Sequence, residues 1–320
     1  MFFSGLVTLM FVLSSCGNVF APKFSDMIYV ANFGSNTVSV IMIGNDNTFD
    51  VPVGTKPDAV GINPQTNMIY VANIGDGTVS VISNSNNTVV ANISVGNYPD
   101  ALGVDPITNT IYVANWINGT VSVINGQTNS VVQTIPVGSE PDAIGVNPQT
   151  NMIYVANDHS NTISVINGQT NSVVQTIPVG SEPDAIGVNL QTNIIYVANE
   201  GSNIYNGSIS VINGQKSSVV QTISVGSEPS GVGVNSQTNM IYIANLGNNT
   251  VSVINGQTNS VTVIIPVENS PVAVGLNPTA NMIYVANEGS NNVSVINGQT
   301  NTVVATLDTE NNPVAVGVLY

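Results

Sequence analysis

An internal repeat of about 42 residues constrains this chain more than any other feature of its sequence. The motif Ile-Tyr-Val-Ala-Asn, or a variant with one changed residue, recurs through the 320 residues. Its tyrosines are Tyr29, Tyr70, Tyr112, Tyr154, Tyr196, Tyr242 and Tyr284. Residues 125–147 and 167–189 are identical over 23 positions. A repeat of this length predicts that copies of one supersecondary unit pack side by side to build a common core.

Each repeat has the pattern of four short β-strands. In one complete repeat the expected strands span residues 141–147, 151–157, 162–166 and 173–179. These segments are rich in Val, Ile and Thr, and clusters of Gly, Pro and Asn separate them. Asn167-Gly168-Gln169-Thr170 predicts a hairpin turn of the Asn-Gly kind between the third and fourth strands. Beyond the N-terminal segment, no stretch has the pattern of a helix.

Four antiparallel strands at a period in the low forties predict a blade of a β-propeller. The second strand of each repeat is apolar nearly throughout, which fits a sheet that is covered on both faces. The first strand always contains a glycine, which permits close approach near the central axis. These glycines are Gly61, Gly103, Gly145, Gly187, Gly233, Gly275 and Gly317.

The count of strands closes the ring. The repeats begin with a second strand at residues 27–32 and end with a first strand at residues 313–319. We therefore expect an all-β fold, a seven-bladed β-propeller of four-stranded antiparallel blades that spans residues 27–320. The C-terminal strand should join the N-terminal strands in one blade, which removes the open sheet edges.

Three motifs of the repeat carry a resemblance to a known family. They are Ile-Tyr-Val-Ala-Asn, Asn-Thr-Val-Ser-Val-Ile and Pro-Asp-Ala-Ile-Gly-Val-Asn-Pro. Together they resemble the YVTN-family β-propeller repeat over residues 27–320, with Ala where the family name has Thr. The resemblance implies export and cell-surface interaction, because similar proteins occur in archaeal surface layers and among bacterial secreted proteins. It supplies no catalytic residues, and a looser similarity to lactonase-type propellers brings no site motif.

Residues 1–26 have the pattern of an export segment and a short linker. Residues 2–13 form an apolar run of secretory length that is too short to span a membrane comfortably. The following Leu-Ser-Ser-Cys resembles a lipobox, so we expect Cys16 to be lipidated and the propeller to lie at the cell surface, touching the membrane only through this anchor. One alternative is a signal peptide cleaved after Ala21. Another is that Cys16 is an ordinary core thiol.

The charge balance excludes several classes of protein. The chain has 18 acids, 3 Lys, no Arg and a net charge of -15, so it lacks the clustered cations that nucleic acids require. Enzymes that hold anionic substrates with Arg are disfavoured for the same reason. The single His, His159, has Asp158 beside it but no triad pattern, and no Cys/His cluster suits zinc. We expect a protein without catalytic activity; the alternative is an exported enzyme of lactonase- or lyase-like type.

The acids gather on one predicted face of the ring. Strand parity places 13 of the 18 acids in the loops of that face, with Lys56 as the one cation among them. Asp58, Asp100, Asp142 and Asp184 begin consecutive first strands near the channel mouth. Their mutual repulsion predicts that they splay into water, titrate upward or hold a hard cation such as Ca²⁺. The alternative is Pro-Asp turn chemistry repeated by copying, with solvated carboxylates.

The same face is expected to carry the residues that depart from the repeat. These candidate ligand-binding residues are Trp116, His159, Tyr205 and Tyr98. Exposed aromatics on a polar rim suit contacts with a glycan or a cell-surface protein, although they could instead cap blade edges. Candidate glycosylation sites are Asn86, Asn92, Asn118, Asn206, Asn248 and Asn292. The sequence thus predicts a binding or structural module that is surface-layer-like.

Overall fold

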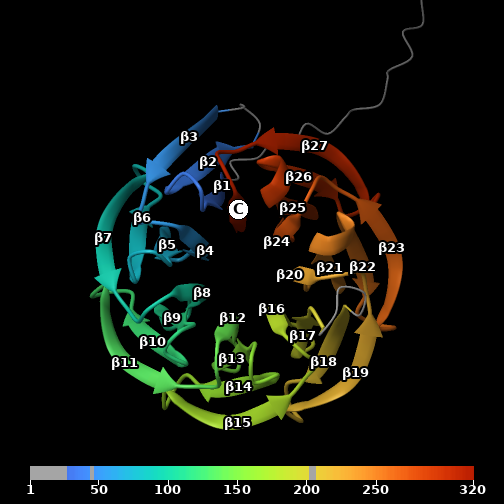
Figure 1. The fold of residues 1–320 in the computed structure, drawn as a ribbon, viewed down its shortest axis with the longest axis horizontal. Coiled ribbons are helices and arrows are strands. Elements are labelled where there is room, and N and C mark those ends of the chain that lie inside the picture. Colours follow the sequence, from blue (N-terminus) through green and yellow to red (C-terminus); the bar gives the residue numbers. More distant parts are fainter. Residues whose placement is uncertain (1–26, 44–46, 202–206) are drawn as a thin grey trace, which may run out of the picture.

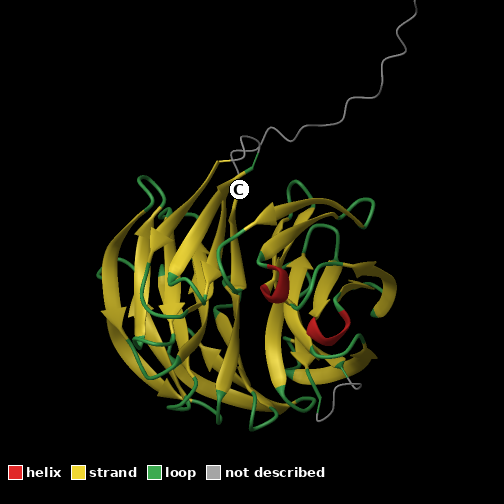
Figure 2. Ribbon diagram, turned by 45° about the horizontal axis from the view of Figure 1, so that its top comes forward, coloured by secondary structure: helices red, strands yellow, loops and turns green. Residues whose placement is uncertain are grey.

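A computed structural model describes residues 27–43, 47–201 and 207–320, and these residues form a ring of seven four-stranded antiparallel sheets (Figure 1). The prediction of an all-β seven-bladed propeller is confirmed. Single turns of 3₁₀ helix, η1 (Leu246–Asn248) and η2 (Glu288–Ser290), are drawn in red in Figure 2. Within the described ranges no helix has both the length and the apolar character needed to cross a membrane.

We name the blades A to G in chain order of their second strands. The first, innermost strands are β28 (Pro313–Leu319), β4 (Pro57–Asn63), β8 (Pro99–Asp105), β12 (Pro141–Asn147), β16 (Pro183–Asn189), β20 (Pro229–Asn235) and β24 (Pro271–Asn277). The second strands are β1 (Met27–Asn32), β5 (Met68–Asn73), β9 (Thr110–Asn115), β13 (Met152–Asn157), β17 (Ile194–Asn199), β21 (Met240–Asn245) and β25 (Met282–Asn287).

The two outer strands of each blade complete the list. The third strands are β2 (Thr37–Met42), β6 (Thr78–Ser83), β10 (Thr120–Asn125), β14 (Thr162–Asn167), β18 (Ser208–Asn213), β22 (Thr250–Asn255) and β26 (Asn292–Asn297). The fourth strands are β3 (Asn47–Pro52), β7 (Thr88–Ser94), β11 (Ser130–Pro136), β15 (Ser172–Pro178), β19 (Ser218–Ser224), β23 (Ser260–Pro266) and β27 (Thr302–Asp308). In blade D every bound lies within one residue of the prediction.

The two ends of the repeat array meet in blade A. Strand β28 pairs antiparallel with β1, with Tyr29 opposite Gly317 and Val30 opposite Val316. The blade therefore has the strand order β28-β1-β2-β3, and the predicted closure is confirmed. This pairing supplies the backbone hydrogen bonds that would otherwise be missing at both edges.

The hydrophobic core lies between neighbouring blades. In one such cluster, Tyr154 and Val165 of blade D pack with Ile195 and Val197 of blade E. Each second strand thus contributes to the interfaces on both of its faces, which is why its sequence is continuously apolar. The seven Ile-Tyr-Val-Ala-Asn tyrosines are all fully buried, with at most 1% of their surface exposed.

The glycine of each first strand makes room for the next blade. A Cβ atom on Gly145 would collide with Ile186 and would lie 2.9 Å from Cγ2 of Val188. Gly317 closes the series, because a Cβ there would lie 2.9 Å from Cγ1 of Val60. The predicted close approach is therefore made by aliphatic side chains of the following blade, which pack onto each glycine. We call this contact the glycine socket.

The turn between the third and fourth strands differs from the prediction. Asn167 Oδ1 accepts hydrogen bonds from the backbone nitrogens of Gln169 at 2.9 Å and Thr170 at 3.2 Å. The left-handed residue is Asn171, with φ of 48°, rather than Gly168. The connection is therefore an Asn side-chain turn of four residues and not a two-residue Asn-Gly hairpin. Gly168 is needed because a Cβ would crowd Asn151 Oδ1 and the Tyr112 hydroxyl.

Asparagine side chains form hydrogen bonds both within blades and between neighbouring blades. The buried Asn157 donates through Nδ2 to the hydroxyls of Thr162 at 3.2 Å and Ser164 at 3.0 Å. On the other side of the ring, Asn147 Nδ2 donates to Asn193 Oδ1 of the next blade at 2.8 Å. These repeated roles explain the high Asn content of the sequence, since an amide both donates and accepts.

Candidate functional site

One face of the ring is built from two kinds of loop, and we call it the loop face. The loops that lead into first strands and the loops between second and third strands are joined there by backbone hydrogen bonds. Asp158 N donates to Glu140 O at 2.8 Å, and Trp116 N donates to Tyr98 O at 2.8 Å. The opposite face, which we call the turn face, carries the remaining turns.

Each blade presents a pair of side chains from this hydrogen-bonded junction. The first member precedes the proline of a first strand and has a left-handed backbone, with φ of 57° at Tyr98 and 54° at Glu140. Its partner directly follows the asparagine of the second strand. The junction pairs from blade A to blade G are Asn312–Phe33, Lys56–Ile74, Tyr98–Trp116, Glu140–Asp158, Glu182–Glu200, Glu228–Leu246 and Ser270–Glu288.

The junction pairs divide the loop face into two sectors. In blades A to C they are mainly apolar and aromatic: the Tyr98 and Trp116 rings are tilted by 43° with centroids 6.0 Å apart. Lys56 Nζ lies 5.4 Å from the centroid of the Phe33 ring, within range of a cation–π interaction. Ile117, next to Trp116, is 56% exposed. We call this region the aromatic sector.

Blades D and E carry acids at both junction positions, and we call this region the acidic sector. Burial is the main cause that raises the pKa of Glu200 to about 7, and the charges of Glu228, Asp142, Glu182 and Asp158 add to it. Burial and the same kind of repulsion raise the pKa of Asp158 to about 6, against an opposing effect of His159. Glu200 and Asp158 therefore take up protons more readily than ordinary surface carboxylates do.

The four aspartates at the start of first strands lie next to one another, as an arc at the channel mouth. Side-chain hydrogen bonds link Asp58 to Asp100, Asp100 to Asp142, and Asp142 to Asp184. Burial first, and then Asp142, raise the pKa of both Asp100 and Asp184. Burial also raises the pKa of Asp58 to about 7. Two neighbouring carboxylates repel each other, and protonation of one of them removes that repulsion. We call these four residues the carboxyl arc.

The arc is a line of pairwise contacts rather than a cage. Among the described residues, no group of three or more His, Cys, Asp or Glu side chains is arranged to hold a metal ion. The upward titration that the sequence analysis offered as one outcome matches the direction of the pKa changes. Calcium at Asp58, Asp100, Asp142 and Asp184 stays a prediction.

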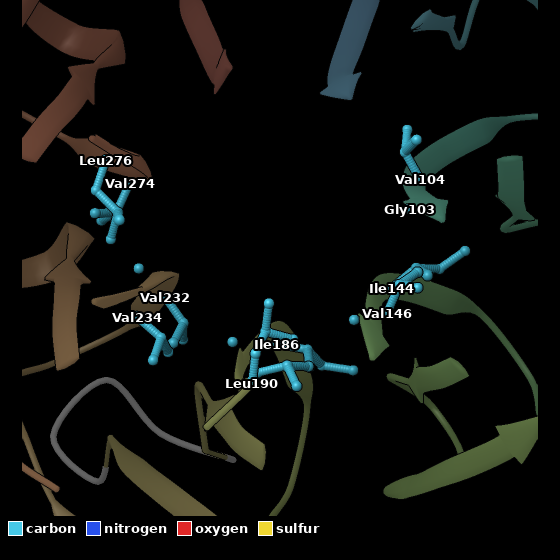
Figure 3. A pocket seen from close by; sticks show the side chains of 14 residues that line it. Gly103, Val104, Ile144, Val146, Ile186, Leu190, Val232, Val234, Val274 and Leu276 are labelled. Carbon is cyan, nitrogen blue, oxygen red and sulfur yellow. The ribbon is translucent and has the colours of Figure 1, made fainter. Parts of the chain in front are cut away.

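Inside the mouth, the central channel contains a cavity of about 340 Å³ (Figure 3). Its wall consists of aliphatic side chains and glycines from β8, β12, β16, β20 and β24, together with Leu190. In Figure 3 the side chains of Val274 and Leu276 lie on the side of their strand that faces β20, where both would meet a Cβ added to Gly233. Each first strand pairs with its second strand only, so its other edge faces the channel, and the wall combines aliphatic side chains with unpaired backbone groups.

The other predicted site residues fall in different places. Tyr98 is 43% exposed and Trp116 is half-buried, so the structure brings these two together. His159 is exposed on its loop, next to Asp158. Cys16, Tyr205 and Asn206 lie outside the described residues.

The candidate glycosylation sites include amides that already make hydrogen bonds. Asn118 Oδ1 accepts from Asn97 N at 2.6 Å, Asn248 Oδ1 accepts from Ser227 N, and Asn292 Oδ1 accepts from Asn287 Nδ2 at 2.8 Å. Asn92 Oδ1 accepts from Ser80 Oγ at 2.9 Å, and Asn86 is exposed. In these four asparagines the side-chain oxygen accepts the hydrogen bond, so the side-chain nitrogen can still bond to other partners. Glycosylation at these positions stays a prediction.

Comparison with known proteins supports the fold. No protein-family model matches the sequence, and neither does any curated protein sequence. Among solved structures, the chain is similar to Kuenenia stuttgartiensis hydrazine synthase, with a TM-score of 0.76 and 18% identity over 83% of this chain and 91% of that one. It is also similar to a functionally unknown protein from Desulfotomaculum acetoxidans DSM 771, with a TM-score of 0.80 and 15% identity over 92% and 99% of the two chains.

At these identities the similarity extends to the fold alone. The β-propeller is therefore supported both by the structure and by its neighbours, whereas membership of the YVTN family stays a prediction. The junction pairs were not foreseen from the sequence; close approach at the first-strand glycines was predicted, but not that side chains of the following blade make it. The junction pairs had a signal there: their two positions vary between repeats that are otherwise nearly identical.

Proposed function

We propose that this protein is an exported, surface-anchored β-propeller that acts as a binding or structural module through its loop face. The observation that carries the proposal is the variation of the junction pairs on a nearly uniform frame. Copies of the repeat keep the same strands, sockets and asparagine contacts. The two junction positions instead carry aromatic, basic or acidic side chains at fixed backbone geometry.

The aromatic sector is the preferred contact surface within this face. Tyr98, Trp116 and Ile117 offer partly exposed apolar surface beside loop amides, a combination suited to sugar rings or to a protein hot spot. The partner class is therefore a cell-surface glycan or protein. The low number of cations argues against nucleic acid as a partner.

A binding screen tests this proposal. The purified full chain is applied to glycan arrays and to surface proteins, and each hit is measured again with Tyr98→Ala/Trp116→Ala. We expect this double variant to weaken binding by at least tenfold. The matched control is Ile107→Ala, which alters a side chain that is 63% exposed on the turn face. Equal binding by the double variant and the control would place the contact elsewhere and contradict the proposal.

Export is a separate part of the proposal and has its own test. The apolar run and the Leu-Ser-Ser-Cys motif support lipidation at Cys16, with the propeller outside the cytoplasmic membrane. Fractionation of cells that make the full chain should recover it with the membranes or outside the cell, and Cys16→Ala should release it from membranes. Intact chain in the cytosol would contradict export.

The alternative function is an exported enzyme of lactonase- or lyase-like type. It is favoured by Glu200, whose pKa of about 7 suits a general acid or base. Against it stand the absence of Arg and the presence of one His in the whole sequence. Hydrolysis of a lactone panel that is lost in Glu200→Gln would favour the enzyme over the binding module.

A further inference from the structure

Another cavity, of about 440 Å³, lies at the outer rim of the loop face between blades A and B. One wall is residues 52–54, where β3 leads into the loop before β4, and the other belongs to β6, β7 and the loop before β6. Strands β3 and β7 follow one another around the outside of the ring in Figure 1. The lining combines the aliphatic Pro52, Val53 and Val89 with the polar Asp76, Thr78 and Asn92. Its size and mixed lining are typical of a small-molecule site.

Two of these polar residues depart from the repeat. At the position of Asp76 five other blades carry Ser or Asn, and each of these accepts a backbone N–H of the adjoining loop, as Asp76 does. At the position of Asn92 four other blades carry Thr. The frame of the blade therefore needs neither the charge of Asp76 nor the amide of Asn92. Among the blades described at both positions, only blade B has an acid together with an amide.

The same positions between blades C and D show how small the difference is. Five of the seven lining positions carry the same residue types there, namely Pro136, Val137, Gly138, Thr162 and Val173. The other two are Ser160 and Thr176, where blade B has Asp76 and Asn92. The cavity between blades A and B is thus distinguished by two polar side chains on a repeated frame.

We propose that this cavity binds a single pyranose ring, with two adjacent hydroxyls of the sugar at Asp76 and Asn92 and a C–H face of the ring against the aliphatic side chains. The site is defined without Tyr98 and Trp116. It therefore does not depend on the function proposed for the aromatic sector.

Buried groups hold the polar side chains in place. Asn73, which is fully buried, donates through Nδ2 to Thr78 Oγ1 at 3.1 Å and to Ser80 Oγ at 3.0 Å. Ser80 Oγ in turn donates to Asn92 Oδ1 at 2.9 Å. The amide nitrogen of Asn92 and the hydroxyl proton of Thr78 are thereby left as donors for a ligand.

Asp76 supplies the acceptor. Its Oδ2 accepts from Thr55 N, which fixes the carboxylate, and a carboxylate can accept further hydrogen bonds. A sugar hydroxyl both donates and accepts, so one hydroxyl can donate to Asp76 while its neighbour accepts from Asn92. The C–H groups of the ring gain free energy when they leave water against Val53 and Val89.

The same groups disfavour other kinds of ligand. An anion would be repelled by Asp76, and none of the described residues that line the cavity is cationic. A calcium ion needs about six to eight oxygens, more than the polar side chains of this lining provide. An apolar molecule would cover Asp76 and Asn92 without replacing their hydrogen bonds to water. A neutral polyol with an apolar face meets both needs of the cavity.

The test is saturation-transfer NMR, followed by calorimetric titration, of the full chain with the methyl glycosides of glucose, galactose, mannose, fucose and N-acetylglucosamine. The chain is made in a host that does not N-glycosylate proteins, so that the Asn92 amide stays free. We expect saturable binding of at least one glycoside, at one site per chain. Absence of binding by all five, or displacement of the bound sugar by glycine or Ca²⁺, would overturn the proposal.

The repeat supplies a variant that removes the site and keeps the frame. Asp76→Ser/Asn92→Thr gives blade B the residues of blade D, where Ser160 Oγ accepts from Ser139 N at 2.8 Å. We expect the sugar to bind at least tenfold more weakly, with an unchanged melting temperature. The matched control is Asn248→Ser in blade F, which should bind as the native chain does. Equal binding by the double variant and the control would refute the site.

Two further variants locate the sugar. Tyr98→Ala/Trp116→Ala should bind the glycoside as the native chain does, and a loss of binding there would place the sugar in the aromatic sector instead. Ser160→Asp/Thr176→Asn should create a second site between blades C and D, so that two sugars bind per chain. A stoichiometry of one in this variant would contradict the assignment of the site to the two side chains.

Discussion

Asp105 offers a test of how the blades are joined on the turn face. In four blades the last polar residue of the first strand donates from Nδ2 to Oδ1 of an asparagine in the next blade, at 2.8 Å in each case. These bonds join Asn63 to Asn109, Asn147 to Asn193, Asn189 to Asn239 and Asn235 to Asn281. In blade C the donor position is occupied by Asp105, which is fully buried.

The carboxylate cannot replace that amide. Asp105 Oδ1 accepts from the backbone nitrogens of Ile107 and Thr108, as the equivalent asparagines do in their own turns. Its Oδ2, however, has no hydrogen-bond partner within the described residues, and neither does Asn151 Oδ1 in the next blade. Two buried acceptors are therefore left unpaired at a position where four other blades have a bond.

Asp105→Asn should restore the missing bond. A buried polar group without a partner costs about 1–3 kcal/mol, so we expect the free energy of unfolding to rise by about that amount. For a domain of this size each kcal/mol raises the melting temperature by about 2 °C, which gives a rise of about 2–6 °C. Thermal and urea denaturation at pH 7 measure the two quantities independently.

The matched control is Asn147→Asp, which creates the same pair of acceptors in blade D. It should lower the free energy of unfolding by a similar amount. If Asp105→Asn leaves the stability unchanged while Asn147→Asp lowers it, then Asn151 has turned its amide to donate to Asp105, and the reasoning fails for this blade. If neither changes the stability, the bonds between blades contribute nothing measurable.

Four further results follow from the structure. Because the folded-state pKa of Asp58 is raised to about 7, the folded state binds the extra proton, and stability should fall as the pH rises from about 4 to 7; Asp58→Asn should flatten that dependence in melting curves. Gly145→Ala should lower the free energy of unfolding by about 1–3 kcal/mol, because the new Cβ meets Ile186 and Val188, and an unchanged urea midpoint would argue against the glycine socket. Deletion of residues 313–320 removes β28 and should lower the melting temperature sharply, since it opens blade A; an unchanged curve would contradict closure. If Ca²⁺ binds the carboxyl arc, it should raise the melting temperature more than NaCl of the same ionic strength does, and an equal rise would leave only screening.

Much of the fold could be predicted because the same pattern of four strands occurs in every repeat. The pattern of one blade gave the bounds of β12 to β15 to within a residue, and the strand count gave the pairing of β28 with β1. The bounds of a strand that are ambiguous in one repeat become clear when several repeats are compared, since the same strand pattern recurs with different neighbouring residues. The turn at Asn167 was predicted wrongly because Asn-Gly was interpreted as a local signal. Glycine is needed at position 168 because a Cβ there would crowd the hydroxyl of Tyr112 in the neighbouring blade, and a local sequence pattern does not contain that contact.

The candidate site was less predictable for a related reason. Strand parity placed the aspartates of the carboxyl arc near the mouth, but their hydrogen bonds depend on the radius of the ring. The wall of the central channel follows from the inner position of the first strands, yet the sequence pattern does not distinguish Val146, which lines it, from a core valine. The left-handed backbone at Tyr98 is set by the junction with Trp116, and the tyrosine itself gives no signal of it.

All glycine sockets run the same way around the ring, because each glycine receives side chains from the blade that follows it in the chain. The glycine of each blade receives aliphatic side chains from the following blade, and the aliphatic side chains of the same blade pack onto the glycine of the preceding blade. Each contact thus joins two different surfaces, which makes it heterologous. Such contacts end only when they close on themselves. A chain that loses β28 would keep an empty socket at Gly275 and unmatched side chains at Val60 and Ile62. The last inner strand therefore supplies one side of two neighbouring sockets, and both sockets depend on it.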